Sequence, residues 1–311
     1  MPVAFWGVAP IAPVHLGFDS IIPALRGARR KGWPLTVLLA DTHLCLSHGI
    51  SSEEARQRAL YYRAYLERHC GISATYVLGS DLHQRPVYMQ ALIAAAANIS
   101  VSRAKGSLPS RVSSKAGPAP LAVSSLMYPV MQCLDGVVAG ARVIIADQGQ
   151  RKIYSLLSAM PPLDQSGNMK ASRAAPRLFT VANGVDIEGK PLRDSSSKTR
   201  ISIHETEGSL AEKVHRMYAP PGGQPLVPGR KNALLWHVKY CMAPWLKEAT
   251  TLHLSGGAKL LFMDFDSFED AYNRGQIHPR DCKPVLVEAL WRRIQHARSQ
   301  VGDELGSWVK K

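Results

Sequence analysis

Three polar side chains, Tyr128, Gln132 and Asp135, follow one another at spacings of four and three residues in the segment SSLMYPVMQCLDG. Residues three and four apart share one face of an α-helix, so these side chains are predicted to line a pocket together. This is the densest polar group in the middle of the chain. On these residues alone, the alternative is a solvated helix face with Tyr128 half-buried.

A second candidate lies near the N-terminus, at His15 and Gly17. Residues 3–8 are predicted to form a buried strand, and apolar residues recur at helical spacing over 21–28. His15 and Gly17 are therefore expected where the first helix leaves the edge of a parallel sheet. Free amide groups and the helix dipole favour phosphate there, and glycine permits close approach. A histidine that only caps or packs is the alternative for so short a motif.

Polar residues also follow the other predicted strands. Residues 34–40, 75–78 and 143–146 are apolar runs typical of buried parallel strands, and 178–181 forms a fifth. Open α/β sheets bind ligands at the carboxyl ends of their strands, so the polar residues found there are site candidates. They are Asp41, Thr42 and His43 after the second strand, Ser80, Asp81 and His83 after the third, and Asp147, Gln148 and Gln150 after the fourth.

The charge balance indicates a polyanionic partner. A net charge of +14 with a pI near 9.7 exceeds what solubility requires and suits RNA or DNA. The Lys and Arg residues are spread along the chain, so a basic soluble enzyme without such a partner is the alternative.

The five cysteines are widely separated, odd in number and without a CxxC pair. This usage favours a reducing compartment and argues against a zinc site or a disulfide framework. No apolar run approaches the roughly 20 residues of a membrane span, and no secretory signal is evident. We therefore expect a cytoplasmic protein with no membrane partner and no metal of its own.

Taken together, these segments resemble the tyrosyl-tRNA synthetases of archaeal and eukaryotic type, which are class I aminoacyl-tRNA synthetases. The similarity covers nearly the whole chain, since KVHRMYAPPG at 213–222 and IHPRDCK at 277–283 continue it. The other segments that carry it are HLG at 15–17, LLADTH at 38–43, YVLGSD at 76–81, YPVMQCLD at 128–135, QGQRKI at 148–153 and SSSK at 195–198.

The resemblance implies an α/β fold with a Rossmann-type parallel-sheet catalytic domain, followed by a mainly helical C-terminal domain. The catalytic domain would span residues 1–205, with a mobile loop that carries the second signature motif at 186–200. Within this domain, Arg103, Lys105, Arg111 and Lys115 lie among Ser, Gly and Pro, which predicts an exposed basic insertion, a loop, at 102–120. An anticodon-binding-like domain would span 206–311. The family also implies a homodimer, an aromatic amino acid and tRNA as partners, and ATP with Mg²⁺ as cofactors.

The same resemblance assigns roles to individual residues. Asp135 would take the phenol hydroxyl of tyrosine, and Asp281 with His278 would read the anticodon. Catalysis would involve His15, Gly17, Arg193, Ser195 and Ser196 in the two signature motifs. The amino-acid site would comprise Phe5, Gly7, Ala9, Tyr128, Gln132, Asp135 and Gln150. The ATP site would comprise His15, Gly17, Asp147, Gln148 and Lys198. Asp281 also suits the N-cap of a helix that follows it.

Several positions depart from the family pattern. Phe5 stands where the family has a tyrosine, and Ala9 where it has a glutamate. Phe18 replaces the second signature histidine, while Arg193 and Asp194 replace a lysine and a methionine. Losing one preorganised donor costs about 10² to 10³ in rate, so adenylation is expected to be slow or repurposed.

Activation of tyrosine or a related aromatic amino acid is the leading interpretation. One alternative is a paralogue that activates or transfers an amino acid in small-molecule biosynthesis. Another is a catalytically silent tRNA-binding protein, and the last is an unrelated nucleotide-binding α/β protein.

Overall fold

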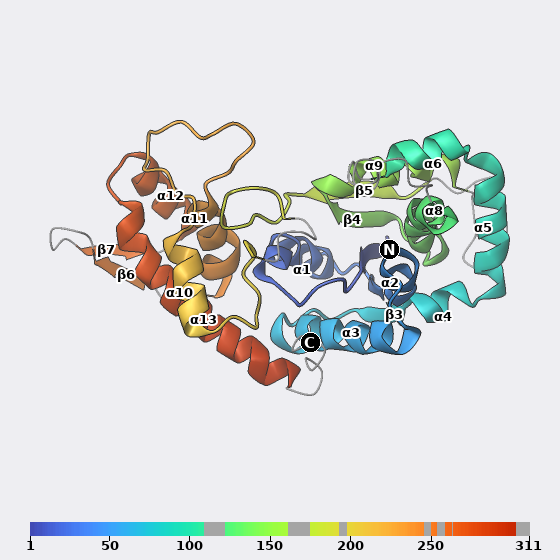
Figure 1. Cartoon of the computed structure of the whole chain (residues 1–311), viewed down its shortest axis with the longest axis horizontal. Helices are drawn as coiled ribbons and strands as arrows, with labels where there is room; N and C mark the ends of the chain where they lie inside the picture. Colours follow the sequence, from blue (N-terminus) through green and yellow to red (C-terminus); the bar gives the residue numbers. More distant parts are fainter. Residues whose placement is uncertain are drawn as a thin grey trace. The chain divides into compact units, whose positions relative to one another are not determined.

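The structure is a computed structural model, which describes residues 1–108, 122–160, 175–192, 198–245, 250–253, 259–262 and 264–302 (Figure 1). The chain forms two compact units. The first comprises residues 1–11 and 21–182, and the second comprises residues 12–20 and 183–302. The predicted functional division at residues 205 and 206 stays a prediction.

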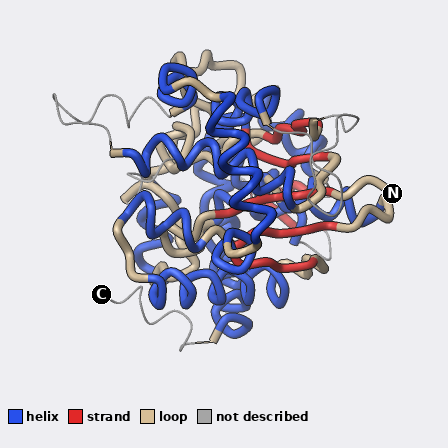
Figure 2. Tube along the Cα trace, turned by 90° about the vertical axis from the view of Figure 1, so that its right-hand side faces the viewer, coloured by secondary structure: helices blue, strands red, loops and turns tan. Residues whose placement is uncertain are grey.

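The first unit is built on a five-stranded sheet of order β3-β2-β1-β4-β5, in which every neighbouring pair is parallel (Figure 2). The central strand β1 pairs Ala4 with Leu35 of β2 and with Val143 of β4. The predicted α/β class with a parallel sheet is confirmed. The strands are β1 (Ala4–Val8), β2 (Leu35–Leu39), β3 (Thr75–Leu78), β4 (Val143–Asp147) and β5 (Arg177–Val181).

Strand order reverses at β1, because β2 and β3 lie on one side of it and β4 and β5 on the other. Such a switch point is where doubly wound sheets bind ligands. The helices of this unit are α1 (Ile22–Arg30), α2 (Asp41–His48), α3 (Ser52–Ala64), α4 (Gly79–His83), α5 (Pro86–Asn98), α6 (Val101–Ser107), α8 (Val123–Val138) and α9 (Arg151–Tyr154). Short helical turns complete it at η2 (Tyr65–His69), η3 (Gln148–Gln150) and η4 (Ser155–Ala159).

The core of the first unit packs α5 and α8 against the sheet. Phe5, Leu38, Tyr88, Leu134 and Ile144 are all buried to 1% exposure or less. This is the burial expected for near-continuous apolar strands that are covered on both faces. The helix α8 that carries Tyr128, Gln132 and Asp135 therefore lies against the sheet.

The second unit is mainly helical, as predicted, but it also contains an antiparallel hairpin that the sequence analysis did not predict. The hairpin pairs β6 (Thr250–His253) with β7 (Lys259–Phe262). The helices are α10 (Glu207–His215), α11 (Ala233–His237), α12 (Phe265–Asn273) and α13 (Pro279–Val301), with shorter turns η1 (Leu16–Ser20), η5 (Val238–Met242) and η6 (Ala243–Trp245).

Two local predictions were wrong. The expected basic loop at 102–120 begins as helix α6, because the Ser100 hydroxyl caps the helix by accepting the Arg103 amide at 3.2 Å. Residues 109–121 lie outside the described residues. The second error concerns Asp281, which is not the N-cap of α13. His278 is, with Nδ1 accepting the Arg280 amide at 3.2 Å.

Candidate functional site

The polar face of α8 lies as the spacing predicts. The rings of His43 and Tyr128 meet edge to face with centroids 4.9 Å apart, and His43 Nε2 is 3.5 Å from Asp135 Oδ2. One imidazole from α2 thus contacts both ends of the predicted face. The prediction that Tyr128 and Asp135 lie on the same side of the helix is confirmed.

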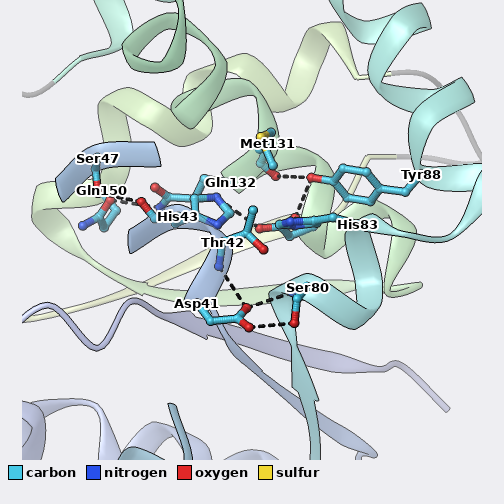
Figure 3. A network of polar contacts seen from close by, with 11 residues as sticks. Asp41, Thr42, His43, Ser47, Ser80, His83, Tyr88, Met131, Gln132 and Gln150 are labelled. Carbon is cyan, nitrogen blue, oxygen red and sulfur yellow. Dashed lines mark hydrogen bonds and ion pairs between the residues drawn. The ribbon is translucent and has the colours of Figure 1, made fainter. Parts of the chain in front are cut away.

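Asp135 is the centre of a buried polar group that we name the Asp135 cluster, comprising Asp135, His43, His83 and Tyr88. Oδ1 of Asp135 accepts the Tyr88 hydroxyl at 2.7 Å and pairs with His83 Nε2 at 2.8 Å. A carboxylate only accepts, so His83 Nε2 carries the proton in this pair. The rings of His83 and Tyr88 lie close together, with centroids 4.5 Å apart (Figure 3). The carboxylate is 1% exposed, so its partners come from the protein itself.

Burial sets the protonation of two members of this cluster. It raises the pKa of Tyr88, and the neighbouring Asp135 carboxylate raises it further, so the phenol keeps its proton and donates it. Burial lowers the pKa of His43, although Asp135 opposes that shift. The cluster is therefore built from a phenol donor and imidazoles around one carboxylate.

A second carboxylate positions the two histidines. Asp41, at the start of α2, accepts the Ser80 amide at 2.8 Å and the Ser80 hydroxyl at 2.7 Å (Figure 3). A Cβ at Gly79 would lie 2.9 Å from Asp41 Oδ1, so this position requires glycine or a shift of the carboxylate. The contact joins the starts of α2 and α4, the helices that carry His43 and His83.

Gln132 and Gln150 form the other half of the α8 face. Gln132 Nε2 donates to Gln150 Oε1 at 3.0 Å. Gln132 Oε1 is buried, and within the described part of the chain it has no hydrogen-bond partner. A buried acceptor ordinarily has a donor, so this oxygen is suited to a ligand N–H or ammonium group.

Phe5, which is expected in the amino-acid site, lies next to α8. Phe5 is 1% exposed, and a Cβ at Gly136 would lie 3.4 Å from its ring. A Cβ at Gly7 would lie 3.6 Å from the same ring, and Ala9 is half-buried against the core. Phe5 thus gives the helix an apolar neighbour beside Asp135.

Asp147 is the last residue of β4 and Gln148 follows it, at the carboxyl end of the strand as predicted. Burial raises the pKa of Asp147, while the amides of Gly149 and Gln150 oppose that shift. Gln148 is exposed. Their role toward ATP stays a prediction.

His15 and Gly17 lie between β1 and α1 in the chain. They belong to the second unit, in a segment that we name the signature loop, residues 15–20, which contains η1. His15 Nδ1 accepts the Gly17 amide at 3.1 Å, and its ring stacks on Phe18 with centroids 4.4 Å apart. Burial and the Arg200 charge lower the pKa of His15 to about 3. The imidazole is therefore neutral at pH 7, with its remaining proton on Nε2.

Glycine is required at two points of close approach around this loop. A Cβ at Gly17 would lie 2.1 Å from Leu192 Cδ1 and 2.8 Å from His15 Nδ1. A Cβ at Gly184 would lie 2.8 Å from the Gly17 carbonyl oxygen. Residues 184–192 therefore fix the loop backbone by direct packing.

A buried ion pair anchors the signature loop. Arg293 of α13 binds Asp19 through both terminal nitrogens, with Nη2 at 2.6 Å from Oδ1, and Nη1 also donates to the Cys241 carbonyl at 3.2 Å. Both side chains are no more than 3% exposed. The bidentate geometry fixes the loop in orientation as well as position.

Asp186 binds residues on both sides of the second signature motif, which was predicted at 193–197. Its Oδ1 accepts the amides of Glu188 at 3.0 Å and Lys190 at 2.9 Å, and its Oδ2 accepts the Thr199 hydroxyl at 2.9 Å. Lys198, the chain neighbour of Thr199, is exposed. Arg193, Ser195 and Ser196 lie outside the described residues, so their predicted roles stay predictions.

Asp281 and His278 lie at the start of α13. His278 is exposed, and Asp281 is half-buried in the first helical turn. Their anticodon role stays a prediction.

The fold and these residues define a Rossmann-type protein with polar side chains at the switch point of its sheet. A family model described as tRNA synthetases class I (W and Y) matches residues 2–295, so the chain belongs to that family. Among the helices of the described residues, none combines the length and apolarity that a membrane crossing needs.

Relatives from archaea support this assignment. The chain is 28% identical over 285 residues to a tyrosine–tRNA ligase of Methanospirillum hungatei, covering 91% of this chain and 86% of the relative. It is 28% identical over 289 residues to the corresponding ligase of Methanoculleus marisnigri, with coverage of 92% and 86%. The crystal structure of tyrosyl-tRNA synthetase from Archaeoglobus fulgidus complexed with L-tyrosine has a TM-score of 0.80 at 24% identity, covering 97% and 90% of the two chains.

The sequence analysis assigned His43 and His83 only as polar residues after strands, and it did not assign Tyr88. His43 and His83 come together because β2 and β3 are neighbours in the sheet. The sequence alone does not show which strands are neighbours. Tyr88 lies in an Ala-rich helix whose sequence carries no polar pattern.

Proposed function

We propose that this chain is an ATP-dependent ligase that activates tyrosine or a closely related aromatic amino acid and transfers it to tRNA. The family assignment supports the class of reaction. The observation that carries the amino-acid site is the α8 face, where Gln132 offers a buried unpartnered oxygen within the described residues and Asp135 lies one helical turn further on.

In this proposal Gln132, Gln150 and Tyr128 bind the ammonium group of the amino acid. The buried Gln132 Oε1 accepts one of its N–H groups, which removes the cost of an unpaired buried acceptor. The aromatic ring points toward the Asp135 cluster, whose phenol, imidazoles and carboxylate interact with a polar substituent on the ring. Phe5 supplies an apolar surface beside it.

The signature loop would bind the phosphates of ATP, which brings its own Mg²⁺. The amino-acid carboxylate attacks the α-phosphorus, and pyrophosphate leaves as the aminoacyl-adenylate forms. The neutral His15 would donate from Nε2 to phosphate oxygens, which gain charge in the transition state. The tRNA 3′ hydroxyl then attacks the acyl carbon and releases AMP.

The partners follow from the same proposal. A net charge of +14 suits tRNA, and Asp281 with His278 would read its anticodon. A homodimer and a cytoplasmic location complete the proposal, in line with the five free cysteines.

The experiment is amino-acid-dependent exchange of labelled pyrophosphate into ATP, tested with tyrosine, phenylalanine, tryptophan and substituted tyrosines. We expect exchange with one of these aromatic amino acids, lost in Asp135→Ala and retained in Asp81→Ala. Asp81 is the matched control because it is an exposed carboxylate on α4. Folded protein without exchange for any of them would contradict the proposal.

A second candidate is a tRNA-binding protein without turnover. Phe18 favours it, because it stands where the family has the second signature histidine and stacks on His15 instead of donating to phosphate. Filter binding of tRNA by protein that shows no pyrophosphate exchange would support this second candidate.

A further inference from the structure

The Asp135 cluster contains three side chains with metal-ligating atoms. One ligand atom each from His43, His83 and Asp135 lies within 4.8 Å of the other two. They come from α2, α4 and α8, so three separate elements contribute to one group. His43 and Asp135 are buried, with side chains 2% exposed, and the His83 side chain is 9% exposed.

The distances within this group are unequal. His83 Nε2 is 2.8 Å from Asp135 Oδ1, which is a hydrogen bond, whereas His43 Nε2 is 3.5 Å from Oδ2. Two ligands of a tetrahedral zinc ion, each bound at about 2.0–2.2 Å, lie roughly 3.4 Å apart. The His43–Asp135 pair already has that spacing. Ligation by His83 Nε2 requires its hydrogen bond to Oδ1 to break, and a ligand atom of His83 already lies within 4.8 Å of those of the other two residues.

His43 has further capacity for a ligand. Within the described part of the chain, neither ring nitrogen of His43 has a hydrogen-bond partner, although the side chain is buried. Buried polar atoms without partners are few in proteins, and an ion at the site is one accepted explanation. Asp135 Oδ2 faces this same imidazole.

The remaining neighbour of the carboxylate is placed to orient it. The Tyr88 hydroxyl donates to Oδ1, which leaves Oδ2 turned toward His43. Hydrogen bonds of this kind, from residues outside the ligand set, hold ligating carboxylates in many metal sites.

We propose that His43, His83 and Asp135 bind one zinc ion, with Tyr88 as a positioning residue for the carboxylate. Two imidazole nitrogens and one carboxylate oxygen suit zinc, whereas magnesium and calcium favour oxygen ligands. Three protein ligands leave a fourth position open. Resting on the proposed function, that position takes an oxygen or nitrogen atom borne by the ring of the amino acid. This proposal departs from the sequence analysis, which expected no zinc site because of the scattered cysteines, and its ligands include no thiol.

The test uses the full-length protein, stripped with a chelator, dialysed and titrated with Co²⁺ as a spectroscopic substitute for zinc. We expect one Co²⁺ per chain, with the intense visible absorption of four-coordinate cobalt, and its displacement by one equivalent of Zn²⁺. The double variant His43→Ala/His83→Ala should lose this binding. His69→Gln, which changes another buried histidine of the same unit, should keep it.

Two milder variants keep the test decisive if the double variant does not fold. His83→Gln should lose four-coordinate cobalt while circular dichroism stays unchanged. Tyr88→Phe should weaken cobalt affinity by about 10- to 100-fold, the range found for residues that orient ligands. A merely structural role for Tyr88 would leave the affinity unchanged.

The failure of this proposal is distinguishable from the failure of the proposed function. Absence of stoichiometric cobalt, or cobalt retained in the double variant, overturns the metal site whatever the exchange activity. Cobalt bound in protein without pyrophosphate exchange leaves the metal site standing and removes the activation proposal. A change in the cobalt spectrum on adding the activated amino acid supports ligation by that amino acid. An unchanged spectrum during active exchange, with Mg²⁺ restored, overturns that ligation.

Discussion

The Asp135 cluster and the signature loop solve the same problem of fixing a few atoms in space by different means. The cluster uses side chains, since three of them, from His43, His83 and Tyr88, converge on the buried carboxylate of Asp135. The loop uses its backbone, since Gly17 and Gly184 allow chain segments to approach too closely for any side chain. A site made of side chains changes chemistry through substitutions, whereas one made of backbone tolerates few changes. Phe5 beside the cluster departs from the family pattern, whereas the loop keeps Gly17 and departs only in a side chain, at Phe18.

The largest expected effect concerns the anchor of the signature loop. Arg293→Met should lower the free energy of unfolding by about 3–5 kcal/mol, because it leaves the Asp19 carboxylate buried without its charge partner. Arg292→Met is the matched control one residue away. Its pair with Glu288 is exposed, so its loss should cost no more than about 0.5 kcal/mol. Urea unfolding of both variants measures the contrast, and equal losses would contradict it.

Close approach at the loop can be tested with a single methyl group. Gly17→Ala should reduce pyrophosphate exchange by about 10²- to 10³-fold, because the new Cβ displaces His15 or Leu192 and with them the phosphate donors. Gly208→Ala provides the control, since its Cβ meets nothing within 4 Å. An active Gly17→Ala enzyme would mean that the loop does not depend on backbone packing.

Acid should lower the free energy of unfolding of the second unit, because this unit contains the buried histidine His237. Burial lowers the pKa of His237 to about 4, so between pH 6.5 and 4 the unfolded chain binds a proton that the folded chain does not. Stability therefore falls as pH falls through this window, and His237 contributes on the order of 2 kcal/mol of the loss between pH 7 and pH 5. Urea midpoints at both pH values should lie closer together in His237→Asn than in wild type. An unchanged difference would refute this assignment.

The smallest effect is expected on the side-chain half of the comparison. Gln150→Ala removes the partner of Gln132 Nε2 and should raise the KM for the amino acid by about 3- to 10-fold, the equivalent of one neutral hydrogen bond. The kcat should change little, because the ammonium end does not react. Steady-state exchange kinetics separate the two, with Gln148→Ala as the exposed neighbouring control for the amino-acid KM. A fall in kcat alone would place Gln150 at the reacting atoms instead.

The sequence predicted the sheet well because its strands are continuous apolar runs bounded by polar residues. It also predicted the common face of Tyr128 and Asp135, since helical spacing alone determines that arrangement. It did not predict that His43 and His83 meet at Asp135, because this depends on which strands are neighbours. Nor did it place His15 in the second unit, since the contacts of that segment are with residues far along the chain.

The prediction of Asp281 as the N-cap of α13 was wrong for a local reason. Asp281 has the preferred side chain for a cap, but Pro279 suits the first helical position, which moves the cap back to His278. When two residues a few positions apart are both suitable N-caps, the backbone geometry of the turn determines which one caps the helix. That geometry does not follow from the residue types alone.

The pairing of Asp19 with Arg293 spans 274 positions of the chain. A ribosome therefore makes the loop long before it makes the arginine that holds it, and the loop can form this ion pair only after Arg293 has been made. The cluster around Asp135 has all its members within the first 135 residues and can assemble earlier. Pulse-labelling with limited proteolysis during synthesis would show the two regions becoming protected in that order.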